Sequence, residues 1–302
     1  MKVIVTGGAG FVGTNLVSRL LKEGYEVISL DNYSTGKKEN EQEGCTYVEV
    51  DVSNSSKLKA KLHWALNKEK PDMIFHLAAL ARIQPSLTNP SKALENNFLS
   101  TVNILEYGRE NNIPIVYAGS SSKHHAPYGS PYAWSKWGGE QLCELYSTCF
   151  QLPTAVCRFY NVYGPYQLEE GEYSTVVGIF EKQYRNNEPL TITDKGEQRR
   201  DFTHVEDIVS GLVKCGRSLV IPNEYHAKVS GEIFELGSGV NFSINELATL
   251  FGEDYPTKYI PAREGEYPVT LCDYSKASKM LGYKPVKSME LYVKEFLSNH
   301  GK

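Results

Sequence analysis

Near the start of the chain stands the stretch Val3-Ile4-Val5-Thr6-Gly7-Gly8-Ala9-Gly10-Phe11-Val12-Gly13. It predicts a short buried strand, a glycine loop and the first turn of a helix, with Gly7, Gly10 and Gly13 at intervals of three. In such a unit one glycine permits the tight turn, one lets the backbone approach a pyrophosphate, and one lets the helix pack close to the strand. Backbone N–H groups at the helix start can then hold phosphates. The alternative is an ordinary strand-to-helix turn, but the position between strand and helix favours a dinucleotide site.

The next predicted strand indicates which dinucleotide. It covers residues 25–30 and ends at Asp31, about 20 residues beyond the loop, where a carboxylate accepts hydrogen bonds from an adenosine ribose. A carboxylate repels a 2′-phosphate, so we expect NAD rather than NADP. Lys37 and Lys38 follow in a polar loop, where we interpret them as a solvated surface pair.

Composition excludes several classes of protein. The chain has 302 residues, 41% of them apolar, which allows one large domain or two modest ones. A net charge of −4 provides no basic surface for nucleic acid. No apolar run approaches the roughly 20 residues that span a bilayer, and the first strand begins almost at once, which leaves no room for a signal peptide. We therefore expect neither a nucleic-acid nor a membrane partner.

Cysteine and histidine usage points to a reducing compartment and to no metal. The six cysteines show no C-x-x-C spacing, which suits the cytosol, so we expect a cytoplasmic protein. The pair His124-His125 has no second Cys/His cluster to accompany it, so we expect no metal site. The cysteines are Cys45, Cys143, Cys149, Cys157, Cys215 and Cys272.

Alternating strands and helices indicate the fold. Helical patterns such as Phe11–Glu23 and Ser91–Asn111 separate apolar runs, which is typical of βαβ units. We therefore expect an α/β protein with a Rossmann-type, doubly wound parallel sheet and a smaller C-terminal α/β substrate-binding region. The predicted strands are residues 2–6, 25–30, 46–50, 72–77, 113–118 and 153–158. The predicted domains are 1–160 plus 200–240 for NAD, and 161–199 plus 241–302 for the substrate.

The run Tyr132-Ala133-Trp134-Ser135-Lys136 is the candidate catalytic motif, because it places a phenol and an ammonium one helical turn apart. The same spacing occurs at Tyr33/Lys37 and Tyr283/Lys287. Only Tyr132 begins a helix shortly after a strand that ends in Ser120-Ser121-Ser122. That strand end lies at the carboxyl edge of the predicted sheet, where open α/β folds bind ligands.

The chemistry expected of this motif is proton transfer. Free tyrosine titrates near 10, but a positive charge about 5 Å away, at an effective dielectric of about 20, is worth roughly two pH units. With Lys136 and an oxidised nicotinamide nearby, Tyr132 would serve as general base and acid near pH 7–8. Ser120 would share the proton and orient the substrate hydroxyl. The alternative is a capped helix with an incidental tyrosine.

Together these residues resemble the extended short-chain dehydrogenase/reductase family, and within it the NAD-dependent sugar-nucleotide epimerases, over nearly the whole chain. Further motifs carry the resemblance. They are Asp31-Asn32 with the following Ser-Thr-Gly, His76-Leu77-Ala78-Ala79, Asn161-Val162-Tyr163-Gly164-Pro165, and Arg200-Asp201-Phe202 with His204-Val205 and Asp207.

The resemblance implies a set of binding residues beside the catalytic Ser120, Tyr132 and Lys136. Phe159 and Tyr160 would border the nicotinamide, and Asn97 would support the site from a neighbouring helix. The expected cofactor residues are Gly7, Gly10, Phe11, Val12, Gly13, Asp31, Asn32, Asp51, Val52, Leu77, Ala78, Ala79, Asn97, Tyr132, Lys136 and Phe159. The expected substrate residues are Ser122, Asn161, Arg200, Arg263, Glu266 and Thr270, with the arginines on the diphosphate.

Two departures from the family pattern bear on the reaction. Related 4,6-dehydratases carry an Asp-Glu pair where this chain has Ser121 and Ser122, and sugar-nucleotide decarboxylases place a glutamate at the second position. Both chemistries are therefore disfavoured. Lys123-His124-His125 stands where many members have Val-Tyr-Gly, so the family pattern does not predict the shape of the pocket wall or the identity of the sugar.

The sequence therefore predicts NAD-dependent epimerisation of a nucleoside-diphosphate sugar at C4, through a transient keto intermediate. A reductase of the same family remains an alternative, and so does a catalytically idle NAD-sensing module. The resemblance also implies a homodimer through helices over 94–107 and 134–149. Their apolar residues include Leu94, Phe98, Leu105, Trp134, Leu142 and Leu145.

The size of the sugar pocket is a separate expectation. In related 4-epimerases, a residue shortly after an Arg-x-Gly-(Asp/Glu) motif guards the sugar, and here that residue is Thr270, after Arg263–Glu266. A small threonine implies room for an N-acetylated hexose.

Overall fold

A seven-stranded parallel sheet forms the centre of the computed structural model, which describes residues 1–124, 127–221, 229–262 and 267–300. The strand order is β11-β6-β5-β4-β1-β2-β3, so the chain winds outward from β1 in both directions. The six predicted strands are confirmed, with ends that differ by at most two residues. The strands are β1 (Lys2–Thr6), β2 (Glu26–Asp31), β3 (Thr46–Glu49), β4 (Met73–His76), β5 (Ile115–Ser120), β6 (Thr154–Phe159) and β11 (Ile233–Leu236).

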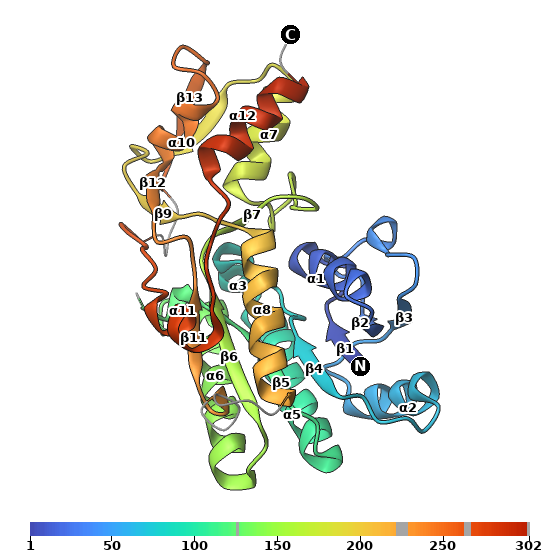
Figure 1. The fold of residues 1–302 in the computed structure, drawn as a ribbon. Helices are drawn as coiled ribbons and strands as arrows, with labels where there is room; N and C mark the ends of the chain where they lie inside the picture. Colours follow the sequence, from blue (N-terminus) through green and yellow to red (C-terminus); the bar gives the residue numbers. More distant parts are fainter. Residues whose placement is uncertain (125–126, 222–228, 263–266, 301–302) are drawn as a thin grey trace.

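Helices cover both faces of this sheet (Figure 1). Alternate residues of β1 point to opposite faces: Val3 and Val5 belong to one apolar core, and Ile4 belongs to the other. The first core is closed by α1 (Phe11–Lys22), α8 (Val205–Val220) and α11 (Ser275–Leu281). The second is closed by α2 (Ser55–Leu66), α5 (Ser100–Asn111) and α6 (Pro131–Phe150). The predicted doubly wound α/β sheet is therefore confirmed.

The helix predicted over Ser91–Asn111 is divided. It consists of α4 (Pro90–Leu94), a π-helical turn η2 (Glu95–Leu99), and α5. The turn contains the buried Asn97, whose amide group binds both the N–H and the C=O of Leu80. A π turn changes the direction of one side chain without ending the helix, and here it accompanies an inward-facing asparagine that periodicity alone did not indicate.

The smaller region contains short sheets and three helices around a third apolar core, which includes Phe180, Leu247, Phe251 and Phe296. Its strand pairs are β7 (Val162–Tyr163) with β10 (Thr203–His204), β9 (Arg199–Asp201) with β12 (Asn241–Ser243), and β8 (Leu190–Thr193) with β13 (Thr257–Ile260). Its helices are α7 (Val176–Arg185), α10 (Ile244–Leu250) and α12 (Met289–His300). Other short elements among the described residues are η1 (Lys38–Asn40), α3 (Ile83–Thr88) and η3 (Ser121–His124).

The division into two domains stays a prediction, and two segments are placed differently from it. The C-terminal segment contributes α11 to the core of the large sheet, where Ala277 and Leu281 pack with residues of α8. Conversely, β9 lies within 200–240 in part, yet it pairs with β12 of the smaller region. The large sheet therefore packs against a helix from the predicted substrate domain, and the smaller region contains a strand that belongs partly to the predicted NAD domain.

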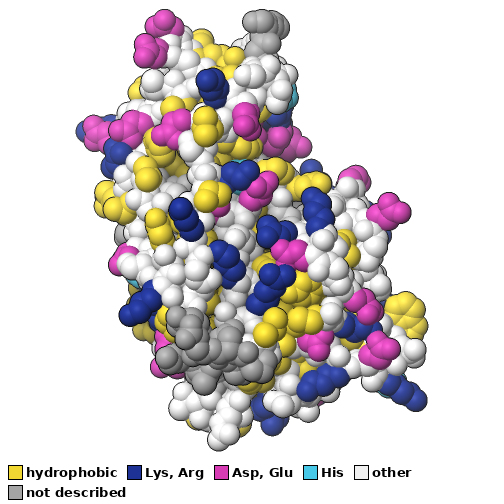
Figure 2. All heavy atoms as spheres, in the orientation of Figure 1, with side chains coloured by type: hydrophobic (Ala, Val, Ile, Leu, Met, Phe, Trp, Pro, Cys, Tyr) yellow, Lys and Arg dark blue, Asp and Glu magenta, His cyan; other side chains and the backbone are white. Residues whose placement is uncertain are grey.

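The surface is of mixed charge. Figure 2 shows acidic and basic side chains spread over the visible face, with hydrophobic side chains between them. Among the described helices, none combines the length and the hydropathy that a bilayer crossing needs.

Candidate active site

A cleft of about 740 Å³ lies where the strands β1, β2, β4, β5 and β6 end at their carboxyl edge. Its other wall comes from the segment before α7, from β8 and β9, and from residues near Thr270. The size is typical of a ligand pocket, and the carboxyl edge is where open α/β sheets bind ligands.

The glycine loop at one end of the cleft fits a dinucleotide. A Cβ atom at Gly7, whose φ is +75°, would lie 2.9 Å from the backbone nitrogen of Ala78. A Cβ atom at Gly13 would lie 1.9 Å from the carbonyl oxygen of Gly7. Gly10 precedes α1 and provides no side-chain cap, so the first N–H groups of the helix face the cleft without a capping oxygen. Such a cradle suits a pyrophosphate.

Asp31 lies at the end of β2, where the sequence placed it. Its Oδ2 accepts from the Ala9 N–H at 2.9 Å and its Oδ1 accepts from the Tyr33 N–H at 2.8 Å. Burial raises the pKa of Asp31, and these backbone hydrogen bonds oppose that shift. Lys38 turns away to pair with Glu49 at 3.4 Å. The geometry therefore supports a ribose site rather than a 2′-phosphate site.

The segment after β4 is held by hydroxyl groups that the sequence analysis did not single out. The Thr6 Oγ1 accepts from the N–H groups of Leu77 and Ala78, each at 3.1 Å, and contacts the His76 Nδ1 at 2.7 Å. The His76 Nε2 contacts the Thr101 Oγ1 at 3.2 Å. No local spacing links these residues, because Thr6 and His76 lie 70 positions apart.

Of the sixteen predicted cofactor residues, all but Asn97 line the cleft. Asn97 lies behind the wall: besides Leu80, its Nδ2 donates to the Ser135 Oγ at 3.1 Å, and that hydroxyl donates to the Tyr132 carbonyl at 2.9 Å. Asn97 therefore connects the wall of the cleft to α6. The resemblance implied such a supporting role for Asn97.

The helix α6 places Tyr132 and Lys136 on the cleft. It begins at Pro131, and the Ser130 side chain accepts a hydrogen bond from the N–H of Ala133. Serine before proline at the first helical position is a strong helix start, so the local sequence determines where this helix begins. Tyr132 then lies in the first turn, and Lys136 follows one turn later.

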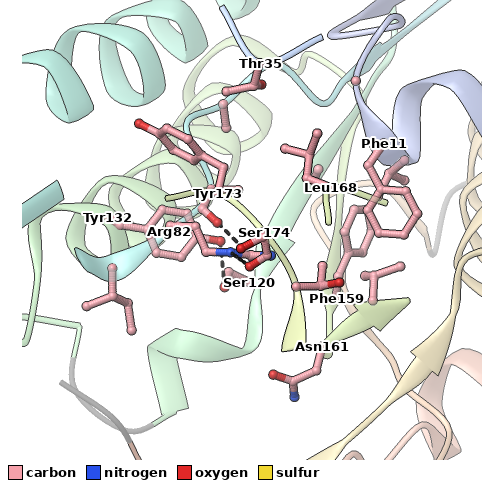
Figure 3. Close-up of a pocket in the computed structure, with 18 of the residues that line it drawn as sticks. Phe11, Thr35, Arg82, Ser120, Tyr132, Phe159, Asn161, Leu168, Tyr173 and Ser174 are labelled. Carbon is pink, nitrogen blue, oxygen red and sulfur yellow. Dashed lines mark hydrogen bonds between the residues drawn. The ribbon is translucent and has the colours of Figure 1, made fainter. Parts of the chain in front are cut away.

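Three hydroxyl groups meet at the floor of the cleft. The Tyr132 Oη donates to the Ser120 Oγ at 3.3 Å, a bond that Figure 3 marks with a dashed line. The Ser120 Oγ lies 2.9 Å from the Ser122 Oγ. The Lys136 Nζ donates instead to the Ala118 carbonyl at 2.7 Å. The structure thus brings the predicted catalytic residues together, with Tyr132 and Ser120 in direct contact.

The expected effect of Lys136 on Tyr132 is wrong for the protein by itself. Burial raises the pKa of Tyr132, and the opposing contributions come from the Ser120 hydrogen bond and the Arg82 charge rather than from Lys136. Burial also lowers the pKa of Lys136 to about 8. The charge of Lys136 alone would lower the pKa of Tyr132, but desolvation disfavours the charged form of both groups.

The predicted substrate residues Ser122, Asn161, Arg200 and Thr270 also line the cleft. The Thr270 Oγ1 accepts from the Asn161 Nδ2 and from the Asp201 N–H, each at 3.1 Å. The Arg200 Nη1 donates to the Tyr267 carbonyl at 2.5 Å. Arg263 and Glu266 lie outside the described residues, so their parts stay predictions.

Arg82 and the segment before α7 are cleft residues that the sequence analysis missed. The Arg82 Nε donates to the Ser174 carbonyl at 3.1 Å, which joins the loop after β4 to the opposite wall (Figure 3). Tyr173 and Leu168 line that wall. Position after a strand end could have indicated Arg82, but nothing in the local pattern indicates the segment before α7.

The altered motif at Lys123-His124-His125 does not form the pocket wall in its described part. Neither Lys123 nor His124 lines the cleft. The His124 Nε2 pairs with the Glu235 Oε1 at 2.8 Å, and its ring stacks on Tyr160. Tyr160 is buried there and does not line the cleft either, whereas Phe159 does. The side chain of His124 therefore contacts Glu235 and Tyr160 instead of the cleft. His125 lies outside the described residues.

Comparisons with known proteins agree with this geometry. The model of the NAD dependent epimerase/dehydratase family matches residues 3–226. The chain is 30% identical to a UDP-glucose 4-epimerase of Mycolicibacterium smegmatis, over 94% of each chain. It is also 30% identical to a UDP-glucuronate 4-epimerase of Thermodesulfobacterium geofontis, over 95% of this chain and 92% of that protein.

A solved structure shares the fold over nearly the full length. It is a UDP-N-acetylglucosamine 4-epimerase of Methanobrevibacter ruminantium in complex with UDP-N-acetylmuramic acid, with a TM-score of 0.84 and 28% identity. The match covers 99% of this chain and 98% of that one.

Proposed function

Because this chain belongs to the NAD dependent epimerase/dehydratase family, we propose that it is an NAD-dependent epimerase that inverts C4 of a nucleoside-diphosphate sugar. The observation that carries the proposal is the Tyr132–Ser120 contact on the floor of the cleft, one helical turn from Lys136. Serines at positions 121 and 122 leave this site without the carboxyl pair that elimination of water requires. Relatives that act on different UDP sugars share this fold, so the nucleotide is proposed to be UDP.

Each catalytic residue has a separate proposed role in the transfer of the proton and the hydride. When bound, NAD supplies the acceptor and donor of the hydride. Tyr132 takes the proton from the sugar hydroxyl and later returns it, and Ser120 holds that hydroxyl within reach of the phenol. Lys136 does not lower the pKa of Tyr132 in the protein by itself, so its positive charge is proposed to favour the phenolate only together with the charge of a bound, oxidised nicotinamide. Because the same tyrosine can serve both directions, the proton returns without a second acid.

Recognition of the ligands is assigned to the two ends of the cleft. Asp31 and the glycine loop around Gly7 hold the adenosine and pyrophosphate of NAD, which the cradle geometry supports. Arg200 and Asn161 lie at the other end, where a guanidinium suits diphosphate oxygens. Arg263 and Glu266 are proposed to complete the nucleotide site. Thr270 is proposed to border the sugar and leave space for an N-acetyl group.

The proposal is tested by incubating the purified enzyme with UDP-glucose, UDP-N-acetylglucosamine and UDP-glucuronate in turn, without added reductant. Chromatography should resolve the C4 epimer of at least one of them, with no net change in NADH absorbance. Stoichiometric consumption of NADH with a keto-sugar nucleotide would instead identify a reductase. No turnover of any nucleotide sugar, together with tight NAD binding, would favour the NAD-sensing alternative.

We also propose a homodimer through α5 and α6. Leu99 of η2, directly before α5, and Leu145 of α6 are 44% and 48% exposed, and Trp134 of α6 packs against Phe98 of η2. Leu105, which the sequence placed on the same face, is buried against the sheet and is excluded from it. Light scattering should give twice the monomer mass at micromolar concentration, and Leu145→Asp should give the monomer mass. Wild type that scatters as a monomer would rule the dimer out.

A cytoplasmic location is the corresponding proposal for the cell. It is supported by six cysteines that are all free in the structure, four of them buried. Fractionation should place the enzyme with cytosolic markers, and recovery with an oxidising compartment would contradict the proposal.

A further inference from the structure

Lys136 lies in surroundings that by themselves favour its neutral form. Its side chain is buried, the Nζ donates to the Ala118 carbonyl at 2.7 Å, and it lies 4.9 Å from the centre of the Tyr117 ring. Burial favours the neutral form of the other titratable groups around it. The pKa of His76 is lowered to about 3, and the pKa values of Cys143, Tyr117 and Tyr132 are raised. None of these groups carries a charge that could hold the ammonium.

One carboxylate does face this site, one turn further along α6. Glu140 is 0% exposed, and Arg158 binds both of its oxygens. The Arg158 Nε donates to Oε1 at 3.0 Å, and Nη2 donates to Oε2 at 2.7 Å. Residues four apart on a helix are neighbours, so the Glu140 charge lies beside the Lys136 stem. Among the described residues, Glu140 is the carboxylate whose charge raises the pKa of Lys136 against burial.

Glu140 stands at the buried end of a chain of hydrogen-bonded polar side chains. The Arg158 Nη1 donates to the Glu235 Oε1 at 2.8 Å, and the same oxygen is 2.8 Å from the His124 Nε2. Exposure increases outward along this chain, from 0% at Glu140 and 6% at Arg158 to 20% at Glu235 and 37% at His124. A buried carboxylate is tolerated when it is paired and hydrogen-bonded, and here the pairing leads to the surface. We call these four residues the Glu140 network.

We propose that Glu140 is a positioning residue for the proton transfer, whose carboxylate, fixed by Arg158, keeps the Lys136 side chain as an ammonium ion. The inference rests on the proposed function for its consequence in turnover, although the charge of Lys136 can be measured without it. The rest of the Glu140 network then has a definite part: Glu235 holds Arg158, and Arg158 fixes the Glu140 carboxylate beside the Lys136 stem.

The test is an NMR titration of the Lys136 amine in the NAD-bound enzyme, labelled with ¹³C and ¹⁵N in lysine. The signal is assigned by its absence in Lys136→Arg. A unit charge one helical turn away, partly offset by Arg158, should be worth about one to two pH units. In Glu140→Gln the midpoint of the Lys136 titration should therefore fall by that amount, and the basic limb of the kcat–pH profile should move by the same amount. Glu140→Asp, which keeps the charge, should restore both toward wild type.

The matched control is Glu235→Gln, which breaks the outer end of the Glu140 network and leaves the Glu140–Arg158 pair in place. It should move the Lys136 midpoint by less than half as much. Glu140→Gln leaves Arg158 less well paired and could fail to fold. In that case the double variant Glu140→Met/Arg158→Met removes the pair together and should still lower the midpoint. A Lys136 midpoint at the wild-type value in the folded variants would overturn the proposal, whether or not the enzyme turns over any sugar.

Discussion

Asp201→Asn should weaken the substrate end of the cleft while leaving the NAD end intact. Asp201 is fully buried, and its two oxygens accept five hydrogen bonds. Oδ1 accepts from the Thr203 Oγ1 and from the N–H and Oγ of Ser238. Oδ2 accepts from the N–H groups of Gly239 and Cys272. One carboxylate therefore ties β9 to the loop after β11 and to the segment that follows Thr270.

The size of the effect follows from this geometry. An asparagine keeps one acceptor oxygen and replaces the other by an amide that can only donate. If the amide takes the Oδ2 position, the buried N–H of Cys272 and the partly buried N–H of Gly239 lose their acceptor. An unsatisfied buried donor costs about 1–3 kcal/mol and a partly buried one less, so Asp201→Asn should lower the free energy of unfolding by about 2–4 kcal/mol. A typical domain has about 5–15 kcal/mol, so the variant should still fold at moderate temperature.

The functional consequence should be confined to one ligand. The Asp201 N–H donates to Thr270, and its carbonyl accepts from the Asn161 Nδ2 at 3.0 Å. Displacing Thr270 and Asn161 should raise the Kd for UDP roughly tenfold, which corresponds to about 1.4 kcal/mol. NAD affinity should stay at the wild-type value, because Asp31 and the glycine loop are held by separate contacts. Urea unfolding and titration calorimetry with UDP and with NAD measure the three quantities.

Asp207→Asn is the matched control. Asp207 is also a buried carboxylate, and it accepts from the N–H groups of Val286 and Lys287, but it does not line the cleft. The Asp207→Asn variant should have a lower free energy of unfolding, but its Kd values for UDP and for NAD should equal those of the wild type. If Asp201→Asn unfolds at the wild-type urea concentration, or weakens UDP and NAD equally, the reasoning is refuted.

Three further predictions concern the cleft itself. Tyr132→Phe should keep NAD binding and lose about two or more orders of magnitude in kcat, the scale of acid–base catalysis; steady-state turnover near wild type would remove Tyr132 from the mechanism. Asp31 should make NAD bind more tightly than NADP in calorimetry, and Asp31→Ser should narrow the difference; equal affinities in wild type would contradict the ribose assignment. Thr270→Tyr should depress turnover of UDP-N-acetylglucosamine more than that of UDP-glucose, with Thr270→Val as the control for losing the hydrogen bonds from Asn161 and Asp201. Equal losses for both sugars would show that Thr270 is not a gate.

Much of the fold could be predicted because its causes are local. Runs such as Val3–Val5 are buried on both sides, and a buried run between turn residues predicts a strand of a parallel sheet. The glycine spacing indicates a tight turn in which a Cβ atom at Gly7 or Gly13 would clash with the backbone. The Tyr132–Lys136 spacing reports one face of one helix. Each of these patterns lies within about a dozen residues, so it can be recognised in the sequence even where, as at Gly7, the contact behind it is with a distant residue.

The segments that the sequence could not place are those whose partners are distant. Arg82 meets Ser174 across 92 residues, and Asp201 meets Cys272 across 71. The π turn at Glu95–Leu99 accompanies the contacts of Asn97 with Leu80, and periodicity has no means of anticipating it. Leu105 matched an exposed apolar face by its spacing, yet the sheet buries it.

The order of residues along the chain establishes which groups are present for the chemistry: a phenol, two hydroxyls, an amine and a glycine cradle. Their charge depends on the folded structure. Whether Tyr132 and Lys136 are ionised depends on how much water remains around them and on Glu140, Arg82 and the other charges that the fold brings close. Desolvation and Coulomb interactions depend on distances in space rather than along the chain, and those distances exist only once the chain has folded.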